Sequence, residues 1–353
     1  MKKRLELIQA SRAIVPLLVA IVHLAGTMQV KYNHNFLGIS DLPKSGGVDY
    51  FFVLTGFMMY YVYGGKIGNK EYYKTFLYNR FIRLYPFYWV LAIPVIPLLL
   101  FVPGLGSDNL DLFTIIKSLL LWPQEHGPYI FVAWSLSYNV FFYIVFALIL
   151  GYSKKIFLYV IGIWSISIGI FSLLPESIFI FEFIFSPYFI NFIIGSIIAS
   201  LIVKFKYHNF YIILLILGLS IFVFNWLNII FIDIDINADF LYLIFASLVI
   251  TGLSGIDLGV SVRVNKFFNY LGDASFAIFL SHTLTISVLT KTMDILGLTN
   301  KLNLTFLGLI IFVGTIIIGC LLYQLIEKPL HSKLKRRSNI KSDGKKAMAS
   351  SLR

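Results

Sequence analysis

Apolar stretches of membrane-spanning length recur along the whole chain, and they restrict its fold more than any other feature. The hydrocarbon core of a bilayer is about 30 Å thick, so a helix needs about 20 mostly apolar residues to cross it. Such windows lie near residues 10–30, 47–64, 84–102, 130–150, 156–174, 186–203, 210–228, 239–256, 272–291 and 304–326. The sequence therefore predicts an all-α integral membrane bundle of about ten transmembrane helices.

The overall composition excludes an ordinary soluble domain. Of the 353 residues, 58% are hydrophobic and only 13% are charged. Soluble globular domains carry about 25% charged residues. A single cysteine, Cys320, excludes an intramolecular disulfide framework.

The positive charges predict the orientation of the bundle. If the ten windows alternate in direction and the N-terminus is cytoplasmic, 23 of the 29 Lys and Arg residues fall in cytoplasmic segments. This asymmetry follows the positive-inside rule and predicts that both termini are cytoplasmic. It also explains the net charge of +12 without a nucleic-acid partner. We expect one membrane domain over residues 1–331 and, over 332–353, a basic, disordered tail that touches anionic lipid.

The first apolar window contains two ionisable side chains, Arg12 and His23. They are eleven positions apart, which on a helix brings them within roughly 20° of the same face and about 16 Å apart along the axis. Ionisable groups inside a membrane are costly, and they usually face a cavity or a partner. A single intramembrane histidine is often only structural, but His282 adds a second one in the ninth window. The three side chains together favour a functional site.

The second window opens with Gly46-Gly-Val-Asp49 and contains Gly56. Asp49 either caps the helix or accepts a hydrogen bond from a substrate hydroxyl. The glycines permit close helix packing. A helix cap with packing glycines explains this pattern almost as well as a site does.

Arg80 and Arg83 begin the third window and share one helical face, because they are three residues apart. They are suited to binding phosphate groups. As an isolated pair, they are better explained as cytoplasmic anchors next to an aromatic belt.

Other polar residues in the later windows have a structural explanation as a default. Hydrogen bonds between helices account for side chains of this kind. Glu327 ends the tenth window, and Pro329 is expected to stop its helix. The six histidines show no paired spacing typical of metal ligands, so no metal is expected. The remaining candidates in the fourth window are Trp134, Ser137 and Asn139.

The order of these pieces resembles membrane-bound acyltransferase family 3, especially its bacterial exopolysaccharide and O-antigen acetyltransferases. The resemblance extends from residue 8 to residue 330 and comprises six short motifs in order. They are Arg12 with His23, Gly-Val-Asp-Tyr-Phe-Phe-Val-Leu-Thr-Gly-Phe at 47–57, Arg-Phe-Ile-Arg-Leu-Tyr-Pro at 80–86, Trp-Ser-Leu at 134–136, Ser-His at 281–282 and Glu327-Lys-Pro.

The resemblance implies O-acyl transfer from a cytoplasmic acyl-CoA, with acetyl-CoA as the expected donor, to a hydroxyl of a cell-surface or lipid-linked carbohydrate. The expected location is the bacterial inner membrane. It marks Arg12 and His23 as the essential pair and associates Arg80 and Arg83 with the CoA end. Asn139 is a departure, because the family usually has a glutamate at this place in its fourth-span motif. Any acid or base role of that glutamate must be absent or filled elsewhere in this chain.

The chemistry of the residues fits this reaction. A sugar hydroxyl is a weak nucleophile, so its attack on a thioester needs a base with a pKa near neutral, and histidine is the usual one. We expect His23 to be that base or to hold the acyl group transiently, and Arg12 to bind CoA or stabilise negative charge. Asp49 is the third candidate catalytic group. The main alternative is a transporter or flippase for a glycolipid, which would also bury Arg, His and Asp. A structural membrane subunit would leave Arg12 and His23 unexplained.

Overall fold

The computed structural model describes residues 3–101, 111–174, 178–202 and 208–336, and helices dominate all four segments. No strand occurs in these ranges. The α-helices are α1 (Glu6–Tyr32), α2 (Gly47–Tyr63), α3 (Tyr72–Phe101), α4 (Leu112–Leu120), α5 (Trp134–Leu150), α6 (Lys154–Phe171), α7 (Phe179–Ile184), α8 (Tyr188–Leu201), α9 (His208–Leu227), α10 (Ala238–Gly259), α11 (Lys266–Ile295) and α12 (Leu304–Leu322).

Every predicted apolar window coincides with a helix, so the all-helical prediction is confirmed. Among the described residues, eight helices are long and apolar enough to cross a membrane. α2, with 17 residues, and α3, which contains Pro86, Pro94 and Pro97, are not among these eight. The exact number of spans and the side on which the termini lie stay predictions.

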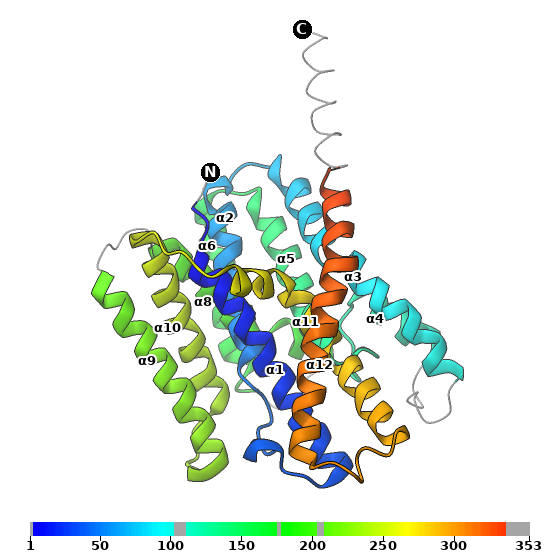
Figure 1. The fold of residues 1–353 in the computed structure, drawn as a ribbon. Helices are drawn as coiled ribbons and strands as arrows, with labels where there is room; N and C mark the ends of the chain where they lie inside the picture. The colour runs from blue at the N-terminus through cyan, green and yellow to red at the C-terminus, as the bar shows by residue number, and fades with distance from the viewer. Residues whose placement is uncertain (1–2, 102–110, 175–177, 203–207, 337–353) are drawn as a thin grey trace.

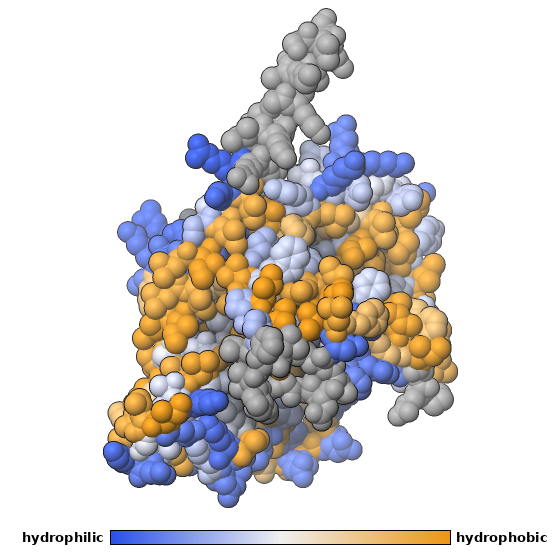
Figure 2. All heavy atoms as spheres, turned by 90° about the vertical axis from the view of Figure 1, so that its right-hand side faces the viewer, coloured by the Kyte–Doolittle hydropathy of each residue, from blue (hydrophilic) through white to orange (hydrophobic). Residues whose placement is uncertain are grey.

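The helices stand side by side, and the start of α1 and the end of α12 lie at the same end of the bundle (Figure 1). We call this end the N-terminal face and the other end the far face. Figure 2 shows, on the face it presents, an apolar band across the middle with hydrophilic residues gathered above and below it. Large apolar side chains such as Ile163, Ile213 and Ile317 are exposed on the helices. A patch of that extent suits lipid rather than water.

Glycines bring α2 and α8 into direct backbone contact. A Cβ on Gly56 would lie 1.8 Å from the carbonyl oxygen of Phe192, and a Cβ on Gly195 would lie 1.9 Å from that of Val53. No real side chain fits at such distances, so only glycine permits this crossing. The packing role expected for Gly56 is confirmed.

Asp257 of α10 holds the beginning of α1. The first N–H groups of a helix have no partner inside it, and α1 has no side-chain cap of its own. Both carboxylate oxygens of Asp257 accept from the N–H of Leu7, and one also accepts from that of Ile8, at 2.9–3.1 Å. An acid 250 positions away in the chain therefore fixes the helix that contains Arg12 and His23.

The short helix α4 was not predicted, and it ends against the middle of α3. Three aromatic side chains of α3 donate hydrogen bonds to the last carbonyls of α4. They are Tyr88 to Ser118 O, Tyr85 to Leu120 O and Trp89 to Leu119 O, at 2.6–2.9 Å. These bonds satisfy acceptors that a helix end leaves free. The chain then returns over residues 121–133 to begin α5.

The prediction that Pro329 ends the tenth helix is wrong. The helix continues to Arg336, after a π-helical turn at Tyr323–Glu327. Proline inside an α-helix clashes with the carbonyl four residues earlier, and the wider π turn lies at that position. The expected disordered tail from 332 is thus helical as far as 336, and residues 337–353 lie outside the described residues.

Candidate active site

A cavity of about 420 Å³ lies between α1, α2, α3, α5 and α11 toward the N-terminal face. Five cationic side chains line it, and its deeper wall is largely apolar. The cations are Lys3, Arg4, Arg12, Arg80 and Arg83. We call it the cationic cavity. Its chemistry suits a ligand with an anionic head and an apolar arm.

Arg12 is held in the wall of this cavity by two neutral partners. Its Nη1 donates to Gln9 Oε1 and its Nη2 donates to Ser275 Oγ, both at 3.1 Å. Neither partner carries a charge, although the carboxylates of Glu327 and Asp273 act electrostatically on the guanidinium. Arg12 therefore presents its positive charge to the cavity from a fixed position.

Arg83 and Glu327 form an ion pair between α3 and the π turn after α12. Nη1 of Arg83 lies 2.6 Å from Oε1 of Glu327, whose side chain is only 2% exposed. The second carboxylate oxygen of Glu327 has no hydrogen-bond partner in the described part of the chain. A buried carboxylate needs a counter-charge, so Glu327 fixes Arg83 at the cavity wall.

Arg80 is held differently, among aromatic rings. Its guanidinium lies 5.8–5.9 Å from the ring centres of Tyr63, Phe76 and Tyr143. Its Nε is buried and makes no hydrogen bond to the described residues. A buried donor without a partner is unusual in a native protein, and a bound anion would supply one.

Asn139 also lines the cationic cavity, as a neutral amide. It accepts from Thr55 Oγ1 at 3.2 Å and donates to the carbonyl of Ser135 at 2.9 Å. Both bonds connect helices or helix turns, which agrees with the default structural role. Ser137 is buried and borders neither this cavity nor the pocket described next.

A smaller pocket of about 120 Å³ lies farther from the N-terminal face and contains His23 and Asp49. We call it the histidine pocket. Aromatic side chains form much of its wall, including Trp134, Tyr188 and Phe131. Aromatic faces beside hydrogen-bonding groups are suited to a sugar ring, which has both apolar and hydroxyl surfaces.

Asp49 does not cap α2, because the cap position is Gly46 and no side chain caps the helix. Its carboxylate is 3% exposed and accepts a hydrogen bond from Asn191 Nδ2 at 3.1 Å. Lys44, also in this pocket, forms a close ion pair with Asp239. Burial lowers the pKa of Lys44, while the negative charge of Asp49 acts in the opposite direction.

His23 lies against a second histidine. The ring centres of His23 and His282 are 5.1 Å apart, and Phe131 packs edge-on to His23 at 5.8 Å. His282 is fully buried, and its Nδ1 donates to the carbonyl of Phe279 at 2.5 Å. Its Nε2 makes no hydrogen bond to any described residue.

The structure thus divides the sequence candidates into two groups. Arg12, Arg80, Arg83 and Asn139 line the cationic cavity, whereas His23, Asp49 and Trp134 line the histidine pocket. His282 and Glu327 border neither space but contact His23 and Arg83. Arg12 and His23 share the inner face of α1, as predicted, yet they open into different spaces.

Sequence reasoning missed several residues of the site. Neither Lys44 nor Asn191 is among the sequence candidates, although Asn191 is an amide within an apolar window. Ser275 gave no signal because Arg12, its partner, lies 263 positions away in the chain. Gln9 lies only three residues before Arg12 on α1, and this helical spacing could have identified it. In the described ranges, no three His, Cys, Asp or Glu side chains are grouped as metal ligands would be.

Comparison with known proteins identifies the family. The model of the acyltransferase 3 family, described as an acyltransferase domain, matches residues 7–324. The chain is also similar to the "Exopolysaccharide production protein ExoZ" of Rhizobium meliloti (strain 1021), with 25% identity over 302 residues, 81% of this chain and 89% of that protein. No solved structure matches significantly. The match includes every lining residue of the histidine pocket and all of those of the cationic cavity except Lys3, Arg4 and Leu5. The protein is a member of the acyltransferase 3 family, a multi-pass membrane acyltransferase.

Proposed function

We propose that this protein transfers an acetyl group from cytoplasmic acetyl-CoA to a hydroxyl of a cell-surface or lipid-linked polysaccharide. The observation that carries the proposal is the pairing of two unlike spaces, one cationic and one containing His23 with Asp49, which adjoin at Val48 and Phe279. The family supplies acyl transfer, and the printed name of the ExoZ relative supports a polysaccharide acceptor.

The cationic cavity is the proposed donor site. CoA carries phosphate groups at one end of a long, mostly neutral pantetheine arm. Arg80, with its unpartnered Nε, and Arg83 would bind the phosphates, with Lys3 and Arg4 adding positive charge. Arg12 lies deeper along α1 and would hold polar groups of the donor nearer the thioester. The N-terminal face is then the cytoplasmic face.

The histidine pocket is the proposed acceptor site. Asp49 would accept a hydrogen bond from one sugar hydroxyl, and Trp134 and Tyr188 would pack against the ring. The acceptor enters from the far face, so the reaction joins substrates from opposite sides of the bilayer. The histidine pocket does not need to bind CoA itself.

His23 would act as the general base. It takes the proton of the sugar hydroxyl as the oxygen bonds to the thioester carbonyl carbon; the C–S bond then breaks, and the CoA thiolate recovers the proton from His23. A two-step version, in which the acyl group first bonds to the His23 imidazole and then passes to the hydroxyl, has the same balance. Asn139, a neutral amide, has no proton-transfer role in either version.

The test is transfer of label from radiolabelled acetyl-CoA into polysaccharide, in membranes with the intact protein or with His23→Ala. A general base contributes about 10²–10⁴-fold to the rate, so we expect label that depends on the protein and falls by that factor in the variant. The control is His34→Ala, because His34 lies at the far face, where it bonds Thr305 and lines neither space. Undiminished label in His23→Ala would remove His23 as the base, and no protein-dependent label with the intact protein would contradict acetyl-CoA as the donor.

A further inference from the structure

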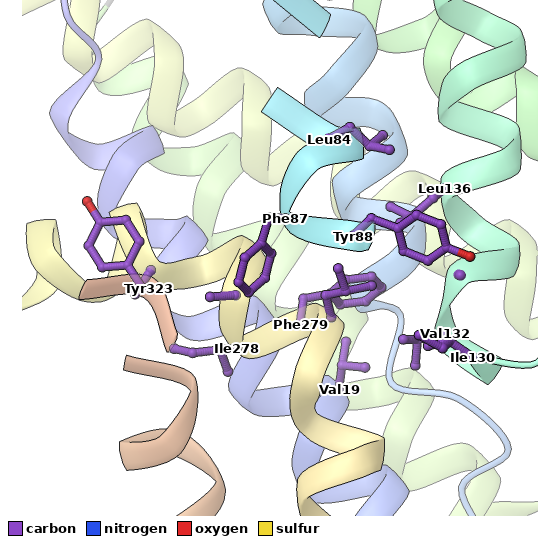
Figure 3. Close-up of a cluster of buried hydrophobic side chains, with 14 of the residues drawn as sticks. Val19, Leu84, Phe87, Tyr88, Ile130, Val132, Leu136, Ile278, Phe279 and Tyr323 are labelled. Atoms are coloured by element: carbon purple, nitrogen blue, oxygen red, sulfur yellow. The ribbon is translucent and has the colours of Figure 1, made fainter. Parts of the chain in front are cut away.

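The cationic cavity and the histidine pocket share only two lining residues in the described chain, Val48 and Phe279. Val48 comes from the first turn of α2, and Phe279 from the middle of α11. Figure 3 shows Phe279 with Leu84 and Leu136, which line the cationic cavity, on one side, and Val19 and Val132, which line the histidine pocket, on the other. The two residues therefore form the partition between the spaces.

The Phe279 side of this partition is rigidly held. Phe279 is 7% exposed, and Phe51 packs edge-on to its ring at 5.8 Å. Its carbonyl accepts the hydrogen bond from Nδ1 of His282, the histidine that contacts His23. Its neighbours Ile278 and Leu280 are fully buried, so α11 cannot move without repacking the core.

The Val48 side is stiff for a different reason. Valine is branched at Cβ and has one strongly preferred rotamer in a helix. The turn that contains it is fixed because a Cβ on neighbouring Gly47 would lie 2.5 Å from Val19. Neither wall of the partition can yield easily to a larger group.

This partition matters because the reacting groups lie on different sides of it. The cations that suit CoA line one space, and the imidazole of His23 lines the other. Only the acyl end of the donor needs to come within reach of His23. A group that arrives there must pass Val48 and Phe279, the two described residues that line both spaces.

We infer that Val48 and Phe279 form a constriction that selects the acyl group by size and restricts transfer to short acyl chains. The inference rests on the proposed function, because it assigns the donor to the cationic cavity. A mismatch of one methylene in an apolar site changes the specificity of an enzyme by about 10–200-fold. The partition thus provides acetyl selectivity without a polar contact to the acyl group.

The test compares acetyl-, propionyl- and butyryl-CoA as donors in membrane vesicles that contain the full-length protein and its acceptor. We expect the intact protein to prefer acetyl over butyryl by at least about tenfold. Val48→Ala and Phe279→Leu both open the partition and should raise the butyryl-to-acetyl ratio by about tenfold or more. Val48→Ile narrows it and should lower the propionyl-to-acetyl ratio.

The matched control is Phe276→Ala. Phe276 lies one turn before Phe279 on α11 and lines only the cationic cavity, beside Arg83. This change should alter the KM for every donor and leave the ratios between donors unchanged. The use of two unrelated opening variants keeps the test valid if one of them fails to fold.

The possible results distinguish failure of the constriction from failure of the proposed function. If the intact protein transfers acetyl but accepts butyryl equally well, or if the opening variants keep its ratios, the constriction is not the selector and the proposed function stands. If the intact protein transfers no acyl group from any CoA donor, the proposed function fails and the constriction with it.

Discussion

The imidazole rings of His23 and His282 lie 5.1 Å apart, centre to centre, on adjacent helices α1 and α11. The carbonyl of Phe279 can only accept, so Nδ1 of His282 carries a hydrogen and Nε2 of the neutral ring has a free lone pair. Nε2 makes no hydrogen bond within the described chain. His282 is therefore ready to accept an N–H from His23 and to orient the proposed base.

Replacement of His282 by glutamine should lower kcat rather than raise the KM for acetyl-CoA, because His282 contacts His23 and not the cationic cavity. Replacement of a residue that orients a functional imidazole by a hydrogen bond lowers activity about 10–100-fold, and we expect kcat to fall by that factor. Steady-state kinetics over a range of acetyl-CoA concentrations separates the two parameters. Thr285→Val, one turn away and facing neither space, should keep the kcat of the intact protein. Equal changes in kcat for both variants would contradict the orienting role.

The Arg83–Glu327 pair should show strong coupling in thermal unfolding of the detergent-solubilised protein. Arg83→Ala leaves the carboxylate of Glu327 buried without its counter-charge, which should cost about 1–3 kcal/mol. The double variant Arg83→Ala/Glu327→Ala removes both groups and should be less destabilised than the sum of the single changes.

Arg80→Ala is the matched control for this double-mutant cycle. The guanidinium of Arg80 packs against aromatic rings and forms no ion pair with a carboxylate among the described residues. It should leave the melting temperature close to that of the intact protein and raise the KM for acetyl-CoA. Additive effects in the Arg83–Glu327 cycle would show that the two charges do not support each other.

Asp257→Ala should destabilise α1, because Asp257 supplies the cap that α1 lacks. The loss of a side-chain N-cap costs about 0.5–2 kcal/mol. Amide hydrogen exchange at Leu7 and Ile8 should rise with the substitution, whereas exchange in the middle of α1 should change less. Unaltered protection at these two amides would show that the carboxylate is not their acceptor.

Gly195→Ala should prevent normal assembly, since its Cβ would overlap the backbone of α2 at Val53. Gly162→Ala is the matched change on α6, where a Cβ meets nothing within 4 Å, and it should leave the protein stable or slightly more stable. The yield of monodisperse protein after size-exclusion chromatography measures both. Equal yields would mean that the helices tolerate a wider crossing.

The fold could be predicted from the sequence because the length of an apolar stretch can be measured within one segment of the chain. Each apolar window could be assessed by itself, and each proved helical. That Arg12 and His23 share one face could be predicted for the same reason, since both lie on one helix with a fixed period. The separation of Arg12 and His23 into two spaces could not be predicted, because Val48 and Phe279, which lie between the spaces, come from other helices.

The partners of the site residues depend on contacts between distant segments. Glu327 lies 244 positions from Arg83, and Asp257 lies 250 positions from Leu7. No local pattern indicates which buried acid meets which cation or helix end. The π turn before Pro329 was missed because the rule applied to the proline predicts a helix end and does not consider a wider turn that accommodates the proline within a continuing helix.

The sidedness of acetyl transfer tests the central claim of two opposed entrances most directly. Acetyl-CoA does not cross membranes, so radiolabelled donor can be added to sealed vesicles of known orientation that contain the protein and its polysaccharide acceptor. We expect inside-out vesicles to incorporate label, and right-side-out vesicles to incorporate it only after they are opened with detergent. Label that enters intact right-side-out vesicles equally well would place the cationic cavity on the outer side and contradict the account.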